Sequence, residues 1–176
     1  MKTLLTFFLC LSGLVPNPSF AASGEETNGK LKLGDPIPAV TAADQNGKPV
    51  DLAQGAKTGY TLVYFYPKAM SPGCTAQACS LRDAYAQLQE RGVKVFGVSV
   101  DPVQAQKAFE QKERLPFELL SDADRQVTSA FGVPLMKNGL ATRQAYLFKD
   151  GKLVWLDAKA STDKQAQDVL AVLASR

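Results

Sequence analysis

The chain contains unbroken apolar runs and other stretches whose apolar positions recur every three or four residues. Residues 60–66 (Tyr-Thr-Leu-Val-Tyr-Phe-Tyr) are strand formers without polar alternation, which is typical of a strand buried on both faces. Pro67 ends this strand. Apolar side chains then recur at helical spacing, at Ala78, Leu81, Tyr85 and Leu88. This periodicity predicts a helix from Cys74 to about Arg91, with Gly92 as its C-cap.

The rest of the sequence predicts a regular succession of strands and helices. The expected elements are a strand over 93–100, a helix opening at Asp101 and Pro102, an extended segment over 115–120, a helix from Ser121 to Gly132, a hairpin over 144–156 and a helix over 162–174. Asp101 is the expected N-cap of its helix. Asn46-Gly47 indicates a small hairpin near the start. This order predicts one α/β domain over residues 31–176, with a mixed central sheet flanked by helices on both faces and an N-terminal β-hairpin.

Residues 1–21 follow the order of a secretory signal peptide: one cation, an apolar run over residues 4–14, two prolines and small residues. A retained membrane anchor is the weaker alternative, because the apolar run is shorter than the roughly 20 residues needed to span a bilayer. We expect cleavage after Ala21, which removes Cys10 and leaves residues 22–30 as a flexible lead-in. The exported compartment is then a bacterial periplasm or a similar space.

Composition narrows the possible chemistry. The chain has 176 residues, of which 45% are hydrophobic, and this fits one compact domain. Its net charge of +3 is spread without blocks of like charge, so the sequence does not indicate nucleic-acid binding. The sequence has no histidine, which excludes Ser-His and Cys-His catalysis and zinc sites that need imidazole. Any nucleophile in this chain must therefore be activated by other means.

Loss of the first 21 residues would leave Cys74 and Cys79 as the cysteines of an exported protein. Disulfides persist in exported compartments, so a structural disulfide is one interpretation of this pair. A loop this short removes little chain entropy, however, and such a bond would stabilise the fold only weakly. The pair therefore also fits redox chemistry.

The segment from Pro67 to Cys74 connects the buried strand to the predicted helix, at the end of the strands where open α/β sheets bind ligands. A cysteine near a helix N-terminus faces unpaired N–H groups and the positive end of the helix dipole, which favour the thiolate. Ser71 can place its hydroxyl near this sulfur, and Gly73 adds a backbone N–H. A guanidinium would complete the site, although the pattern alone does not identify which arginine supplies it.

These residues resemble the active site of the peroxiredoxin family. Pro67, Ser71 and Cys74 fit its pattern Pro-x-x-x-Thr/Ser-x-x-Cys, and residues 71–83 are similar to the bacterioferritin comigratory protein, or peroxiredoxin Q, subfamily. Further similar segments are residues 96–101, 115–122 and 131–133. The resemblance extends from about Leu33 to the C-terminus. It implies a thioredoxin-like fold and a thiol peroxidase that needs neither a metal nor an organic cofactor.

The resemblance also implies a role for each site residue. Cys74 would be the peroxidatic cysteine, which a hydroperoxide oxidises to sulfenic acid. Cys79 would be the resolving cysteine, which closes an intramolecular disulfide onto Cys74. Arg143 takes the place of the arginine that hydrogen-bonds the peroxide and the thiolate, and Pro67 would shield the sulfur. Ser71 stands where threonine is common in the family.

Several functional expectations follow from this resemblance. The substrates would be hydrogen peroxide and organic hydroperoxides, and the reductant a thioredoxin-like protein. A resolving cysteine in the same chain removes the need for a partner subunit, so we expect a monomer. Gln77 departs from the carboxylate that the subfamily often has there, which leaves any positioning or proton-transfer role at this position open.

Two other functions remain as alternatives. An exported protein thiol-disulfide oxidoreductase shares the fold, but such enzymes typically use Cys-x-x-Cys, whereas four residues separate Cys74 from Cys79 here. A non-catalytic exported domain with a structural disulfide is the other alternative.

Residues five apart in an unbroken helix have Cα atoms about 8 to 9 Å apart, and disulfides rarely bridge more than about 7 Å. A bond between these cysteines therefore predicts unwinding of the first turns of the helix.

Overall fold

Seven strands form one mixed sheet in the computed structural model, which describes residues 30–175. The strands are β1 (Thr41–Ala43), β2 (Pro49–Asp51), β3 (Tyr60–Phe65), β4 (Val93–Ser99), β5 (Glu118–Ser121), β6 (Gln144–Lys149) and β7 (Lys152–Asp157). Their order across the sheet is β2-β1-β5-β4-β3-β6-β7. The three central strands β5, β4 and β3 run parallel, and the outer strands pair antiparallel. The predicted mixed α/β architecture is confirmed.

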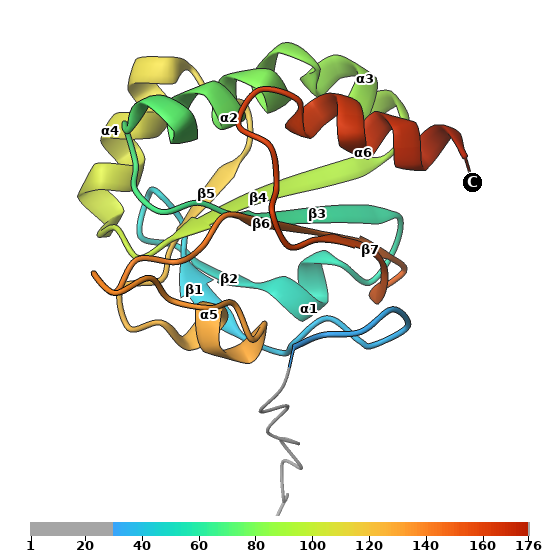
Figure 1. Ribbon diagram of the computed structural model, residues 1–176, viewed down its shortest axis with the longest axis horizontal. Helices are drawn as coiled ribbons and strands as arrows, with labels where there is room; N and C mark the ends of the chain where they lie inside the picture. The colour runs from blue at the N-terminus through green and yellow to red at the C-terminus, as the bar shows by residue number, and fades with distance from the viewer. Residues whose placement is uncertain (1–29, 176) are drawn as a thin grey trace, which may run out of the picture.

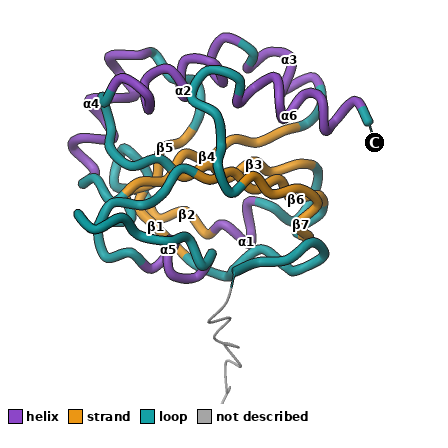
Figure 2. The backbone as a smooth tube through the Cα atoms, viewed as in Figure 1, coloured by secondary structure: helices purple, strands orange, loops and turns teal. Residues whose placement is uncertain are grey.

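Helices cover both faces of this sheet (Figure 1). They are α1 (Leu52–Gly55), α2 (Pro72–Asp83), α3 (Tyr85–Glu90), α4 (Val103–Glu113), α5 (Gln126–Ala130) and α6 (Gln165–Ala174). Figure 2 shows α2, α3, α4 and α6 on one face, and α1 and α5 on the other. The longer helices thus form one layer, which carries the predicted site.

Each face of the sheet has its own hydrophobic core, and β3 contributes to both. Leu62 and Tyr64 pack into the core under α2, α4 and α6, whereas Val63 and Phe65 pack into the core beside α1 and α5. Successive side chains of a strand point to opposite faces. All four are fully buried, which explains why the sequence of β3 shows no polar alternation.

The predicted helix from Cys74 to Arg91 proves to be two helices. The first begins earlier than expected, at Pro72, where the missing N–H of proline costs no intrahelical hydrogen bond. It ends at Ala84, whose φ of −98° and ψ of 8° interrupt the helix before α3 begins. The apolar spacing continues through this break because both helices pack on the same core. Gly92 has a φ of +69° and follows the second helix, as expected of a glycine at a helix end.

Asp101 is not the N-cap of α4, contrary to the sequence-based expectation. The N-cap position is Pro102, which makes no side-chain cap. The Asp101 carboxylate instead accepts hydrogen bonds at 2.7 Å from the Ala69 backbone N–H and from the Ser99 hydroxyl. The side chain therefore ties the loop before α2 to the end of β4.

β1 and β2 pair antiparallel next to the turn that contains Asn46 and Gly47. Asp44 accepts hydrogen bonds from the backbone N–H groups of Asn46 and Lys48, at 2.7 and 2.8 Å. Gly47 has a φ of +79°, a conformation that glycine adopts without steric cost. The Asn-Gly signal thus coincides with the observed turn.

The predicted signal peptide (residues 1–21) and all but the last residue of the lead-in (residues 22–30) lie outside the described residues. Within residues 30–175, the helices are too short or too polar to cross a bilayer.

Candidate active site

Cys74 lies in the first turn of α2, directly after the buried strand β3 and its connecting loop. Its side chain is 1% exposed. The Thr75 N–H donates to the Ser71 carbonyl at 2.8 Å, which closes the first turn around the cysteine. Ser71 is the N-cap residue and Pro72 follows it. The sulfur therefore occupies the positive end of the helix dipole, as the sequence predicted.

The structure brings Arg143 to Cys74 across 69 positions of sequence. Arg143 directly precedes β6, and the register of the sheet pairs Gln144 with Phe65, the last residue of β3. The arginine thus starts beside the loop that leads to α2. Its Nη2 donates a hydrogen bond to Cys74 Sγ at 3.2 Å. A hydrogen bond from a cation to a thiolate is charge-assisted, so this contact stabilises negative charge on the sulfur.

A chain of buried amides holds the other side of the guanidinium. Arg143 Nη1 donates to Gln77 Oε1, and Gln77 Nε2 donates in turn to Gln165 Oε1 at 2.8 Å. Both glutamines are fully buried. Gln77 therefore positions Arg143. The sequence left open whether residue 77 has a positioning role, and this contact supports one. Sequence analysis missed Gln165, because a glutamine 88 positions away carries no pattern that links it to α2.

Gly73 allows the close approach of the arginine. A Cβ at this position would lie 3.4 Å from Arg143 Nη2 and 3.3 Å from Thr162 Cγ2, at the edge of tolerable contact. A glycine inside a helix costs about 0.5–1 kcal/mol relative to alanine. Here the missing side chain gives the guanidinium room beside α2.

Ser71 and Pro67 lie in the loop before α2, where the Ser71 hydroxyl makes a different contact from the one expected at the sulfur. The Ser71 hydroxyl donates to the Lys68 carbonyl at 2.9 Å, and no hydrogen bond joins it to Cys74 among the described interactions. Pro67 is half-buried. Ser71 therefore stabilises the turn in this state of the protein.

Cys79 lies further along α2 and has a different environment from Cys74. Both cysteines are free, and Cys79 is half-buried. Its Sγ donates to Glu113 Oε2 at 3.7 Å. Burial raises the pKa of the Cys79 thiol, and Glu113 raises it further, whereas Arg82 lowers it; the net direction is upward. Cys79 is therefore held as a protonated thiol.

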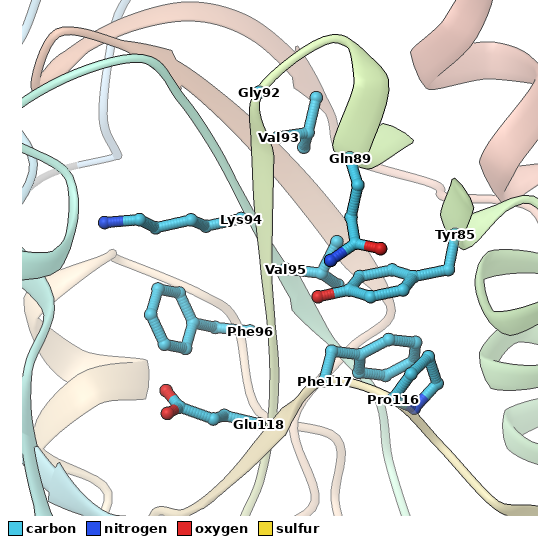
Figure 3. A pocket seen from close by; sticks show the side chains of 10 residues that line it. All are labelled: Tyr85, Gln89, Gly92, Val93, Lys94, Val95, Phe96, Pro116, Phe117 and Glu118. Carbon is cyan, nitrogen blue, oxygen red and sulfur yellow. The ribbon is translucent and has the colours of Figure 1, made fainter. Parts of the chain in front are cut away.

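A hollow of about 450 Å³ lies apart from these residues. It surrounds the start of β4 and contains none of the predicted site residues (Figure 3). Figure 3 shows Lys94, Phe96 and Glu118 pointing to one side of β4 and Tyr85 and Gln89 lying on the other. Catalytic groups of α/β sheets gather at the carboxyl ends of parallel strands. The hollow is at the opposite end of β4 and is not the active site.

Within residues 30–175, no three His, Cys, Asp or Glu side chains gather in a way that could hold a metal ion. Among these residues, the groups linked by hydrogen bonds at Cys74 are its own thiol, the Arg143 guanidinium and the side-chain amides of Gln77 and Gln165.

Residues 33–156 match the AhpC/TSA family. The chain belongs to this family.

The curated relatives identify the type of peroxiredoxin. Peroxiredoxin Bcp of Escherichia coli strain K12 is 50% identical over 105 residues, which are 58% of this chain and 65% of that protein. The match thus spans slightly less than two thirds of the bacterial relative. The chloroplastic peroxiredoxin Q of Oryza sativa subsp. japonica is 36% identical over 169 residues, which are 91% of this chain and 77% of that protein. This peroxiredoxin therefore belongs to the bacterioferritin comigratory protein and peroxiredoxin Q group.

Solved structures agree with this assignment. Peroxidoxin BcpB from Mycobacterium tuberculosis superimposes with a TM-score of 0.76 at 33% identity, covering 82% of this chain and 97% of that chain. The bacterioferritin comigratory protein of Xanthomonas campestris, whose structures concern its alkyl peroxide reduction activity, gives a TM-score of 0.74 at 26% identity and covers 82% and 96%. The thioredoxin-like fold expected of a peroxiredoxin is confirmed.

Proposed function

We propose that this peroxiredoxin is a thiol peroxidase that reduces hydrogen peroxide and organic hydroperoxides. The observation that carries the proposal is the 3.2 Å hydrogen bond from Arg143 Nη2 to the buried Cys74 Sγ. A cation fixed beside a sulfur at a helix N-terminus suits a nucleophilic thiolate. The family assignment and the alkyl peroxide reduction of the Xanthomonas campestris relative support the same reaction.

In the first step, the Cys74 thiolate attacks the terminal oxygen of the hydroperoxide. An S–O bond forms, the O–O bond breaks, and the leaving alkoxide or hydroxide takes up a proton to give an alcohol or water. The product on the enzyme is Cys74 sulfenic acid. Arg143 donates to the oxygen that gains charge, in a site where burial of Cys74 strengthens electrostatic interactions. The backbone N–H of Gly73 is a further donor near α2, and Pro67 shields the sulfur. The Ser71 hydroxyl becomes a donor there only when it leaves the Lys68 carbonyl.

In the second step, Cys79 attacks the sulfur of Cys74. The S–S bond forms, the S–O bond breaks, and the released hydroxide combines with the proton of Cys79 to give water. Both cysteines lie in α2, whose residues 72–83 form a continuous helix in the reduced protein. Because helical residues five apart are too distant for a disulfide, the helix unwinds locally during this step. The enzyme is then an atypical 2-Cys peroxiredoxin.

A thioredoxin-like protein returns the disulfide to two thiols, which closes the cycle without a metal or an organic cofactor. Export to the periplasm, through the signal peptide expected at residues 1–21, would place the enzyme with periplasmic reductants. The resolving cysteine is in the same chain, so a monomer contains all groups that the cycle needs.

Stopped-flow oxidation of the reduced mature protein by hydrogen peroxide tests this proposal. We expect fast oxidation that disappears in Cys74→Ser. Cys79→Ser should still form a sulfenic acid, detected by dimedone labelling and mass spectrometry, but no intramolecular disulfide. Oxidation of the wild-type protein no faster than that of a free thiol would contradict the peroxidase function and favour a thiol-disulfide oxidoreductase.

A further inference from the structure

The contact between Cys79 and Glu113 has no role in the two steps above. Glu113 is the last residue of α4, and its Oε2 accepts a hydrogen bond from Cys79 Sγ at 3.7 Å. Its main-chain carbonyl accepts a second hydrogen bond from Arg82 Nη1 at 2.8 Å. One residue thus receives two hydrogen bonds from α2. Together they hold the second half of α2 against the end of α4.

The two cysteines of α2 therefore face opposite charges. Cys74 accepts a hydrogen bond from a guanidinium, whereas Cys79 donates one to a carboxylate. A thiolate cannot donate a hydrogen bond, so the Cys79–Glu113 contact exists only while Cys79 keeps its proton. The negative charge of Glu113 disfavours loss of that proton.

Burial is the strongest influence on Cys79 and disfavours its thiolate, and Arg82 acts in the opposite direction. Arg82 favours the thiolate, but its guanidinium forms an ion pair with Asp83 at 2.8 Å and is partly exposed to solvent. Asp83 disfavours the thiolate. The Tyr64 phenol of β3 lies beneath α2 and is buried in its neutral form, because burial raises its pKa. Glu113 is thus the group from a neighbouring helix that opposes ionisation of Cys79.

We propose that Glu113 is a positioning residue that holds Cys79 as a protonated thiol docked on α4 until Cys74 has been oxidised. This proposal rests on the proposed resolving role of Cys79. Glu113 has two effects in the resting enzyme. It keeps Cys79 a weak nucleophile, so that peroxide reacts at Cys74, and it stabilises the helical form of α2. When α2 unwinds, Cys79 leaves the carboxylate and its proton becomes available to the departing hydroxide.

Alkylation of Cys79 in the Cys74→Ser background tests the charge effect without any peroxidase chemistry. The rate of reaction with iodoacetamide follows the thiolate fraction. Glutamine has nearly the same shape as glutamate but no charge. We expect Glu113→Gln to shift the pH midpoint of the alkylation rate downward and to increase the rate at pH 7 severalfold. Glu113→Asp, which keeps the charge, should return the midpoint toward that of the parent protein.

Glu110→Gln is the matched control. Glu110 lies on the same helix, but its carboxylate pairs with Lys107 at 3.1 Å and has no described contact with Cys79. This variant should leave the pH midpoint unchanged. An unchanged midpoint in Glu113→Gln, or an equal shift in both variants, would overturn the proposal.

A second measurement uses the protein with both cysteines. After one equivalent of hydrogen peroxide, Glu113→Gln should convert the Cys74 sulfenic acid to the disulfide severalfold faster than wild type, while the sulfenic acid itself forms at an unchanged rate. Slower conversion would overturn the proposal, because Glu113 would then assist the attack of Cys79 as a base. If wild-type protein forms sulfenic acid but never the disulfide, the resolving role of Cys79 fails instead, and the alkylation result still stands by itself.

Discussion

Gln77 Nε2 donates a hydrogen bond to Gln165 Oε1 at 2.8 Å and so connects α2 to the first residue of α6. The same Gln77 accepts a hydrogen bond from Arg143 through its Oε1. The amide is neutral, so it orients the guanidinium without forming an ion pair with it. The positive charge of Arg143 remains available to Cys74.

Replacement of Gln77 by leucine tests this arrangement. Arg143 loses a buried acceptor and Gln165 loses a donor, so we expect a stability loss of about 1–3 kcal/mol. Oxidation of Cys74 by peroxide should slow, because the guanidinium is no longer fixed. Urea unfolding and stopped-flow oxidation measure the two effects. Gln87→Leu, at an exposed position of α3, is the control and should change neither quantity appreciably; equal losses in both variants would contradict the assignment.

Arg143→Lys keeps the positive charge but removes the planar donor set that contacts Cys74 and Gln77 together. We expect the second-order rate constant for Cys74 oxidation to fall by roughly 10²-fold, the usual effect of removing a donor from a site of developing charge. The far-UV circular dichroism should be unchanged. Arg91→Lys, at an exposed position after α3, serves as the comparison, and full activity in Arg143→Lys would show that charge alone suffices.

Formation of the disulfide should expose backbone amides of α2. We expect faster hydrogen exchange for residues 75–80 in the oxidised protein than in the reduced protein, measured by mass spectrometry. The strand β3 should keep its protection in both states, because it pairs with β4 and β6 at the centre of the sheet. Equal exchange of residues 75–80 in the two states would mean that the bond forms without unwinding.

The fluorescence of Trp155 offers a second report on the same event. Trp155 is the sole tryptophan of the chain and packs against the core under α2 and α6. Its emission should change in the phase in which Cys79 closes the disulfide, and Cys79→Ser should lack this phase. A tryptophan signal of the same amplitude in Cys79→Ser would show that the emission follows only the oxidation of Cys74.

The rate of disulfide formation should increase with pH. Burial, and to a lesser extent Glu113, raises the pKa of the Cys79 thiol, and the thiolate is the attacking form. At a given pH below this pKa, Cys79 has a smaller thiolate fraction than an exposed cysteine. The rate of disulfide formation should therefore continue to increase up to a higher pH than it would with an exposed cysteine. Rapid mixing at about pH 6 to 9, a range around the ordinary cysteine pKa, measures this dependence. A rate independent of pH would indicate that unwinding of α2 limits the step.

Much of the fold could be predicted because local sequence patterns specify it. The run of strand formers in residues 60–66, the glycines after helices and the Asn-Gly turn each predicted an element at or near its observed position. The break at Ala84 could not be predicted, because the apolar spacing from Leu81 to Leu88 is the same whether one helix or two helices cover the core. The prediction that Asp101 is the N-cap of α4 was also wrong. An aspartate before proline fits the N-cap sequence pattern whether or not its carboxylate forms hydrogen bonds elsewhere.

By itself, the sequence determined the order of strands and helices and the position of Cys74 after a buried strand, because these depend on neighbouring residues. The resemblance to peroxiredoxins supplied the choice of Arg143. Only the tertiary structure decided which buried groups meet: the amide chain from Gln77 to Gln165 and the carboxylate of Glu113 beside Cys79. Such pairs join residues far apart in the chain, and their geometry depends on how helices pack on the sheet, which no local pattern encodes.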